Sequence, residues 1–483
     1  MSTYISLKKV SLTAYLFCFI LAAPLICKSQ NSPFYKEAYE RTINLDFEYQ
    51  ALKTHTPSSP GEAFIFHYRL TLAYLVTENA ELIDLLEDNE SLIEDLINQL
   101  QGPWRRFFLA EIKLRSAFIN LKLGNELSAA WNIRQAYKLT SENTELYPKF
   151  VNNKKTSGLL HVLIGSIPEQ YQWVLNLMGM NGDVQTGLNE LAIIATNNDV
   201  FSIEAGLLSR VIDAYLLNNS EQATDNIEQI LDGGPLLSYI GMAIAMKNSD
   251  ASMAISIYEK TLNKSQNPLL AYLAGEAHLQ LGNYNKARNS LETFLATFKG
   301  ENFIKDTYYK LGLAALLQQD LKKAESLFLT AQNRGQTLTE ADKHAQRMIE
   351  NGLPDPAIMQ IRLFTDGGQF QKADSIIKLV DDEQLKINDQ LEFTYRKARL
   401  QHKLGEYPIA IGLYKNVISL QQNDAYFAPN SCLQLGYIYN AQGNEEQAKY
   451  FFEKVLSYKH HAYKNSLDNK AKTALKSIKN TSR

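Results

Sequence analysis

The side chains that could do chemistry are few in this 483-residue chain, and their spacing suits no catalytic arrangement. His460 and His461 are the only adjacent histidines, but neighbouring residues on a helix point about 100° apart, so they form a poor metal chelate. The acidic runs Asp381-Asp382-Glu383 and Glu445-Glu446 indicate solvated surface rather than acid/base pairs. Gly-x-Ser-x-Gly, His-Glu-x-x-His and a Gly-rich phosphate loop are all absent from the sequence. We therefore predict no catalytic residue, no metal site and no cofactor, and a protein that is not an enzyme.

Cysteine usage and charge exclude further classes of site and partner. Cys18 and Cys27 lie in the first thirty residues, which leaves Cys432 alone in the body of the chain, without an internal disulfide or a Cys-based zinc site. We expect Cys432 to be a small buried side chain on a helix. The net charge is -3 and no dense Lys/Arg block is present, so nucleic acid is not an expected partner.

The first thirty residues have the pattern of a targeting segment. A Lys8-Lys9 pair precedes the apolar run from Val10 to Ile26, and Cys27-Lys28-Ser29 offers a cleavage site before Gln30. We predict a signal peptide over residues 1–29, with an uncleaved leader that associates with the membrane as the alternative. The body of the protein is then exported, to a periplasmic or outer-membrane-associated address in a bacterium, without a transmembrane span in the mature chain.

The C-terminal half contains an internal repeat, which must position any binding residues. In one copy Leu311-Gly312 is followed by Ala324 and Phe328, and in another Leu435-Gly436 is followed by Ala448 and Phe452 at the same spacing. Copies begin near residues 110, 204, 235, 268, 305, 354, 391 and 429. This pattern resembles the tetratricopeptide repeat (TPR). The resemblance implies an all-α fold, a TPR-type α-solenoid of antiparallel helix pairs, and a scaffold for protein–protein interaction.

Small residues explain how the two helices of a pair could approach. We expect Gly275, Gly312 and Gly436 on first helices to meet Ala287, Ala324 and Ala448 on second helices. Four glycines at helix ends should adopt a left-handed conformation, namely Gly282, Gly368, Gly405 and Gly443. The step from 305 to 354 is long, and its extra residues predict an added helix around Glu340 to Glu350.

The most apolar stretch after the leader runs from Leu159 to Asp183. Pro168 interrupts it, so neither half approaches the roughly twenty residues that a membrane helix needs. We interpret the Leu159–Met180 helices as a buried apolar hairpin, and leave open an apolar ligand pocket or a membrane-surface contact. Asn181 or Asp183 can cap a third helix, which carries Gly187-Leu188.

This stretch carries a second resemblance. Ile167-Pro168, Gly179-Met180-Asn181-Gly182-Asp183 and Gly187-Leu188 resemble a signature of the family that holds the inclusion-body-clearance protein and the tetratricopeptide repeat protein thirty-nine group. The resemblance covers roughly residues 105 to 460 and implies a helical repeat protein without an established catalytic centre. Met180 stands where that family has an aromatic residue, and the expected export departs from its intracellular members.

These features predict five segments along the chain. They are a signal peptide (1–29), an N-terminal helical region (30–109), an early TPR-like helix pair (110–153), an apolar helical-hairpin insertion (154–203) and a TPR superhelix (204–483).

The predicted binding surface is the concave face of the superhelix, where positions two, five, nine, twelve and thirteen of each unit point in TPR-type repeats. Tyrosine and arginine are favoured where binding energy concentrates. The candidate partner-binding residues are Tyr272, Glu276, Tyr309, Arg362, Tyr395, Arg399, His402 and Tyr437. We expect an exported, non-catalytic scaffold that binds protein or peptide partners in this groove. The alternative is a carrier of a lipid or other apolar ligand in the cell envelope, using the Leu159–Met180 helices.

Overall fold

The computed structural model describes residues 36–167, 175, 178–197, 201–217, 219, 223–225, 227, 233–352, 355–421 and 424–481. These residues form helices and turns with no β-strand among them, so the predicted all-α class is confirmed. The predicted signal peptide and most of the Tyr171–Met180 run lie outside the described residues. Within the described ranges, no helix is both long enough and apolar enough to cross a bilayer.

The described residues fall into two compact units. Unit 1 comprises the described residues up to Ile244 together with Ile257–Ala271 and Thr293–Glu301. Unit 2 comprises Ala245–Ser256, Tyr272–Glu292 and the described residues from Asn302 onward. All eight candidate partner-binding residues belong to unit 2.

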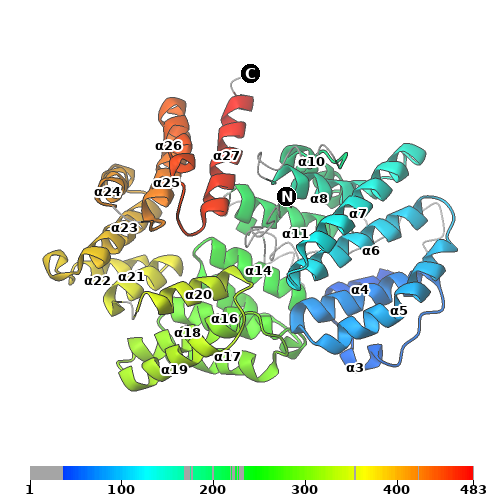
Figure 1. Ribbon diagram of the computed structural model, residues 1–483, viewed down its shortest axis with the longest axis horizontal. Coiled ribbons are helices and arrows are strands. Elements are labelled where there is room, and N and C mark those ends of the chain that lie inside the picture. The colour runs from blue at the N-terminus through cyan, green and yellow to red at the C-terminus, as the bar shows by residue number, and fades with distance from the viewer. Residues whose placement is uncertain are drawn as a thin grey trace, which may run out of the picture. The chain divides into compact units, whose positions relative to one another are not determined.

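Unit 1 is built mainly from antiparallel helix pairs (Figure 1). After α2 (Lys36–Ile43) and α3 (Tyr49–Leu52), the pairs are α4 (Pro60–Thr77) with α5 (Ala80–Asn98), α6 (Pro103–Lys122) with α7 (Glu126–Leu146), and α8 (Asn153–Gly165) with α10 (Val184–Ala195). The unit continues with α11 (Ser202–Ile212) and the π-helical turn η2 (Asp213–Leu217). The α4–α5 pair lies in the segment for which the sequence predicted helices without a pairing.

Glycines allow the close approach of α8 and α10. A Cβ atom on Gly187 would lie 2.4 Å from the carbonyl oxygen of Gly158, and one on Gly182 would lie 2.6 Å from Ile164. Asp183 caps α10 by accepting a hydrogen bond from the backbone N–H of Thr186 at 2.8 Å, as one of the two capping alternatives predicted. The first half of the apolar stretch is therefore packed against the third helix.

A buried ionic cluster joins three helices of unit 1. Glu111 of α6 contacts Arg115 at 3.4 Å and Lys155 of α8 at 2.6 Å, and Lys155 contacts Glu204 of α11 at 3.3 Å. Burial raises the pKa of Glu111, but the neighbouring Lys155 and Arg115 outweigh burial and lower it overall. The guanidinium of Arg115 also lies 4.3 Å from the ring centroid of Phe64. The cluster therefore keeps these charges paired inside the helical core.

Helices α14 to α17 contain residues of both units. They are α14 (Pro235–Lys247), α15 (Ala251–Lys260), the short 3-10 helix η3 (Lys264–Gln266), α16 (Leu269–Gln280) and α17 (Tyr284–Thr297). The starts of α14 and α16 agree with the repeat copies expected near 235 and 268.

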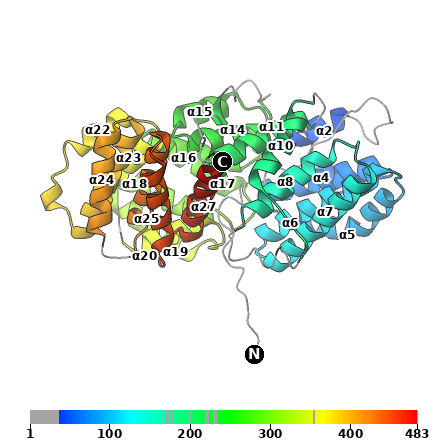
Figure 2. The ribbon, with the colours of Figure 1, turned by 90° about the horizontal axis from the view of Figure 1, so that it is seen from above.

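Unit 2 continues as further pairs, of which α23 and α24 run side by side in Figure 2. The pairs are α18 (Ile304–Leu317) with α19 (Leu321–Asn333), α21 (Pro356–Asp366) with α22 (Phe370–Ile377), α23 (Ile387–Lys403) with α24 (Tyr407–Leu420), and α25 (Phe427–Ala441) with α26 (Glu445–Ser457). The 3-10 turn η4 (Asp382–Gln384) precedes α23, and α27 (Lys464–Thr481) packs on α25 and α26. The predicted added helix is confirmed as α20 (Glu340–Glu350).

The first-helix glycines make room for large side chains of the second helix. A Cβ on Gly312 would lie 2.8 Å from the Phe328 ring, and a Cβ on Gly436 would lie 2.4 Å from the Phe452 ring, so the nearest atoms belong to the residue one helical turn after Ala324 and Ala448. A Cβ on Gly275 would lie 2.6 Å from Leu291 and 3.3 Å from the carbonyl oxygen of Ala287, so the expected approach to Ala287 is confirmed. The left-handed conformation expected at four helix ends is confirmed, with positive φ angles at Gly282, Gly368, Gly405 and Gly443.

Candidate functional site

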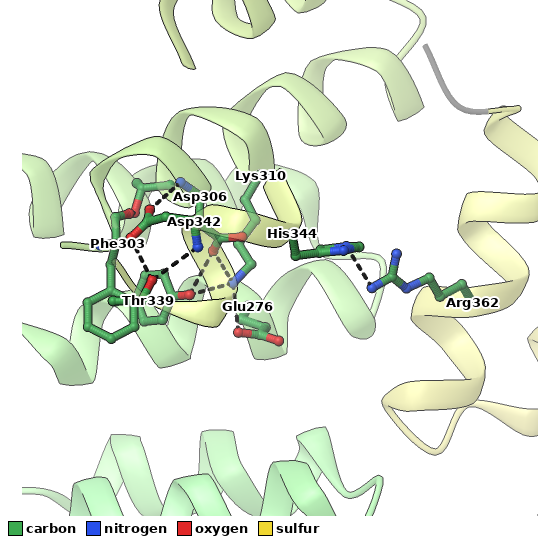
Figure 3. A network of polar contacts seen from close by, with 10 residues as sticks. Glu276, Phe303, Asp306, Lys310, Thr339, Asp342, His344 and Arg362 are labelled. Carbon is green, nitrogen blue, oxygen red and sulfur yellow. Dashed lines mark hydrogen bonds and ion pairs between the residues drawn. The ribbon is translucent and has the colours of Figure 1, made fainter. Parts of the chain in front are cut away.

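A charged network joins α16, α18 and α20 (Figure 3). The ammonium of Lys310 lies 2.6 Å from Asp306 and 2.8 Å from Glu276, and it donates to the hydroxyl of Tyr272 at 2.8 Å. Tyr272 in turn donates to Asp306 at 2.7 Å. Burial lowers the pKa of Lys310, but the two carboxylates outweigh burial and raise it, so Lys310 remains charged. The network thus uses Tyr272 and Glu276 to tie one repeat to the next.

Asp342 of α20 caps the start of α18. Its carboxylate accepts hydrogen bonds from the backbone N–H groups of Phe303 at 2.7 Å and Asp306 at 3.0 Å, and from the hydroxyl of Thr339 at 2.6 Å. Phe303 is the N-cap of α18 and offers no side-chain cap of its own. Burial raises the pKa of Asp342 to about 6. The added helix therefore satisfies N–H groups that the preceding repeat leaves open.

The same inter-repeat contact occurs twice in unit 2. The side chain at position five of one repeat unit is hydrogen-bonded to the side chain at position two of the next unit. Tyr272 is bonded in this way to Asp306, and Tyr395 to Asn430, each at 2.7 Å. Position nine bonds position six of the next, as Glu276 does with Lys310 at 2.8 Å and Arg399 with Gln434 at 3.2 Å. Tyr272 and Tyr395 are 4% and 2% exposed, so their rings hold repeats together.

The remaining candidates lie on the same first helices and differ in access. His402 makes a 3.2 Å contact with the hydroxyl of Tyr414, and Tyr437 packs edge-on against the Phe452 ring. Burial, helped by the neighbouring positive charges of Arg399 and Lys403, lowers the pKa of His402 to about 4. The half-buried candidates are Glu276, Arg362, Arg399, His402 and Tyr437.

Tyr309 and Arg362 belong to a group that we call the arginine–tyrosine cluster, namely Tyr309, His344, Arg347, Arg362, Arg396, Tyr426 and Tyr463. Arg362 lies 3.0 Å from Nε2 of His344, and Nδ1 of His344 lies 2.8 Å from the Tyr463 hydroxyl. Because a guanidinium only donates, Nε2 accepts and Nδ1 carries the proton. Burial lowers the pKa of His344 well below its usual value, and the surrounding cations Arg362, Arg347, Lys310 and Arg396 lower it further. His344 is therefore neutral.

Sequence reasoning missed several members of these networks. Asp306 and Asn430 occupy position two of their units, so the position rule that selected Tyr272 and Tyr395 could have found them. Lys310 and Gln434 occupy position six, which lies outside that rule. His344, Arg347 and Tyr463 come from the added helix and from the residue before α27, and no repeat position identifies them.

Neither a metal-ligand group nor a surface depression coincides with the candidate partner-binding residues in the described part of the chain. No group of three or more His, Cys, Asp or Glu side chains in the described part of the chain could hold a metal ion. A shallow depression between α17, α18 and α19 is lined by Arg288, Glu292 and Lys323 among others. None of the eight candidate residues lines it.

Comparison with known families identifies the repeat. Two family models described as tetratricopeptide repeat match the chain, one at residues 272–337 and the other at residues 429–459. Both matches fall on copies that the sequence spacing identified. No curated protein matches the sequence, and nothing in these matches concerns the narrower family that the 159–188 stretch resembles.

Solved structures of other helical repeat proteins align with the chain at low identity. A human IFIT1 dimer with PPP-AAAA is 14% identical, with 88% of this chain and 95% of that chain covered and a TM-score of 0.33. The P58(IPK) TPR domain is 15% identical, with 75% and 99% covered and a TM-score of 0.21. Yeast Tom70 is 14% identical, with 92% and 82% covered and a TM-score of 0.24. The two matching family models, together with the in-phase helix pairs on which they fall, show that the chain contains tetratricopeptide repeats.

Proposed function

We propose that this tetratricopeptide repeat protein is a non-catalytic scaffold that binds protein partners through the first-helix face of unit 2, formed by the described parts of α16, α18, α21, α23 and α25. One observation carries the proposal. Tyr272 and Tyr395, buried at position five of their units, hold neighbouring repeats together, which fixes the spacing of the half-buried residues Glu276, Arg399 and His402 on the same helices. Glu276, Arg362, Arg399, His402 and Tyr437 then present polar groups on a preorganised surface, which lowers the entropic cost of binding.

We propose an exported address for this scaffold. The support is the N-terminal sequence, with its Lys8-Lys9 pair and the apolar run that follows. A partner would then belong to the periplasm or to the outer membrane. Cell fractionation of the full chain in its own host tests the address, and recovery of the protein in the cytoplasm alone contradicts it.

Site-specific photo-crosslinking tests the binding face. A photo-reactive amino acid replaces Tyr437, which is half-buried on first helix α25, or Tyr450, which is 52% exposed on second helix α26. Both positions carry tyrosine in the same repeat, so Tyr450 is a matched control. We expect a specific adduct from position 437 and none from position 450. Adducts from position 450 alone would assign the partner to the outer face and refute the proposal.

A carrier of an apolar ligand is the second proposal, and it rests on the Leu159–Met180 helices. In the described part of that stretch, Leu159, Leu160 and Val162 are at most 1% exposed. Glycine contacts also hold α8 directly against α10. Since packing uses this surface, we rank the carrier below the scaffold. Native mass spectrometry of protein purified from its own envelope tests it, and the carrier proposal requires a co-purifying apolar molecule.

A further inference from the structure

The added helix α20 interrupts the contact that joins neighbouring repeats. Tyr309 occupies position five of its unit, as Tyr272 and Tyr395 do in theirs. Those two hydroxyls reach a residue at position two of the following unit. The helix that follows the α18–α19 pair is α20, and it places His344 edge-on to the Tyr309 ring, with ring centroids 6.2 Å apart. The Tyr309 hydroxyl finds no hydrogen-bond partner among the described residues, although Tyr309 is only 3% exposed.

A buried hydroxyl without a partner costs free energy, so its retention in a well-packed site suggests a ligand group that completes it. The Tyr309 ring lies edge-on to His344, and the two ring nitrogens of His344 contact Arg362 and Tyr463, so Tyr309 belongs to the arginine–tyrosine cluster. Arg362 and the carboxylates of Asp306 and Glu392 all interact electrostatically with its hydroxyl. Arg347 adds a second open group, because its buried Nη2 atom has no hydrogen-bond partner in the described part of the chain. The two open donors come from different helices and are linked through His344 and Tyr463, since His344 contacts the Tyr309 ring and the Tyr463 hydroxyl, and Arg347 lies over the Tyr463 ring.

The positive charges of the cluster are not balanced equally. Arg396 pairs closely with Glu392, at 2.5 Å, and Lys310 is held by Asp306 and Glu276. Arg362 reaches Asp366 at 3.8 Å. The Arg347 guanidinium lies 4.8 Å from the ring centroid of Tyr463 and forms no ion pair within the described ranges. Arg347 is therefore the cation of the cluster that lacks a carboxylate partner among the described residues.

We propose that Arg347, Arg362 and the Tyr309 hydroxyl bind a carboxylate from an acidic segment of a protein partner, an inference that rests on the proposed scaffold function. Two guanidinium groups and a hydroxyl match the acceptor oxygens of a carboxylate. Neutral His344 accepts a hydrogen bond from Arg362 and so orients it without competing as a cation.

The aromatic rings favour an acidic peptide over a nucleic acid. Bases bind single-stranded sites by stacking on open aromatic faces. Tyr309 and Tyr395 are at most 3% exposed, and Arg347 lies over the face of Tyr463. Tyr426 packs edge-on against Tyr463 at 5.2 Å. The cluster offers directed donors but no open stacking platform.

Fluorescence anisotropy with a labelled Glu-Ser repeat peptide tests the proposal on the full chain, with the Gln-Ser peptide as the uncharged comparison. We expect Arg347→Gln and Arg362→Gln each to weaken binding of the acidic peptide by about tenfold, as for the loss of a charge-assisted hydrogen bond. Arg334→Gln is the matched control. It removes the same charge from an exposed residue at the end of α19 and should leave the affinity within about twofold, as expected for a distant surface charge.

Tyrosine-to-phenylalanine changes separate a binding role from a structural one. Tyr309→Phe removes a hydroxyl without a partner, so the free protein should unfold at a higher temperature while its affinity for the acidic peptide falls by about threefold to tenfold. Tyr395→Phe removes a hydroxyl bonded to Asn430, so it should lower the unfolding temperature and leave the affinity unchanged. Because Tyr309→Phe removes no hydrogen bond within the protein, this variant should remain folded. It therefore tests the proposal even if an arginine variant unfolds.

Three results would overturn the inference: equal binding of the Glu-Ser and Gln-Ser peptides, unchanged affinity in Arg347→Gln, or tighter and Arg347-dependent binding of a single-stranded oligonucleotide. The proposed scaffold function survives the first two results if position 437 still crosslinks a partner. If no position on the first-helix face crosslinks but the acidic peptide binds through Arg347, the scaffold proposal fails and the anion site remains.

Discussion

Replacing Gly436 by alanine tests the packing of a repeat most directly. The new Cβ would lie 2.4 Å from one carbon of the Phe452 ring and 2.6 Å from the next. Phe452 is fully buried and Tyr437 packs against its edge, so the ring has no free space to enter. Overpacking of this kind costs about 1–3 kcal/mol. Alanine returns about 1 kcal/mol through its higher helix propensity. We expect a net loss of up to about 2 kcal/mol of unfolding free energy in the α25–α26 pair.

Gly412→Ala is the matched control. Gly412 lies on α24 in the same unit, and a Cβ there meets nothing within 4 Å. Without a clash, helix propensity alone should stabilise the protein by about 0.5–1 kcal/mol. The two identical substitutions should thus shift stability in opposite directions.

Urea unfolding followed by circular dichroism, with amide hydrogen exchange in α25 and α26, measures the difference. The exchange measurement is needed because a repeat array can open pair by pair. Adding Phe452→Leu to Gly436→Ala should recover part of the loss, since a smaller side chain leaves room for the methyl group. If Gly436→Ala is as stabilising as Gly412→Ala, glycine is not required for close approach and the packing argument is refuted.

Three further predictions concern single groups. Cys432 is 0% exposed, and burial raises its thiol pKa to about 12. In a chain without the two leader cysteines, a thiol reagent should therefore label Cys432 only when α25 opens. Prompt labelling of the native protein contradicts this prediction. The lowered pKa of His402, about 4, means that the unfolded chain binds a proton below about pH 6.5 while the folded chain does not, so stability should fall between about pH 6.5 and 4 by up to about 3 kcal/mol. His402→Gln should flatten that part of the pH profile, and an unchanged profile would assign the effect to other groups. Asp342→Asn places an amide where a carboxylate accepts three donors, so thermal unfolding should show a loss of about 1–3 kcal/mol, with faster hydrogen exchange at the backbone of Phe303; equal stability would mean that the cap is not needed.

The repeat could be predicted because its signals are local. Glycines at helix ends and the regular spacing of Gly312 and Gly436 depend on residues in one helix pair, and the 305–354 step identified α20 by length alone. The tyrosines show where this reasoning stops. A position rule gives the face on which Tyr272 and Tyr395 lie, but their burial depends on residues 34 and 35 positions away. His344 and Tyr463 are 119 residues apart and meet only in the folded chain.

The α4–α5 pair was missed for a related reason. Helix α4 is buried around most of its circumference, because consecutive residues such as Phe64, Ile65 and Phe66 are all buried. It therefore lacks the alternation of apolar and polar faces that marks a repeat helix. Its N-terminal end does carry local signals. Ser59 caps the helix by accepting a hydrogen bond from the N–H of Glu62, and Pro60 occupies the first turn.

The buried ionic cluster of unit 1 has a consequence for the order in which the chain matures during synthesis. Most repeat arrays can form pair by pair as they emerge, since each pair contacts only its neighbours. The ion pair of Glu111 can form only after Lys155 has been synthesised, 44 residues later, and Lys155 also contacts Glu204. An α6–α7 pair that closed alone would bury Glu111 and Arg115 without the lysine that compensates them. Unit 1 should therefore stay loosely packed on the ribosome until α11 has emerged.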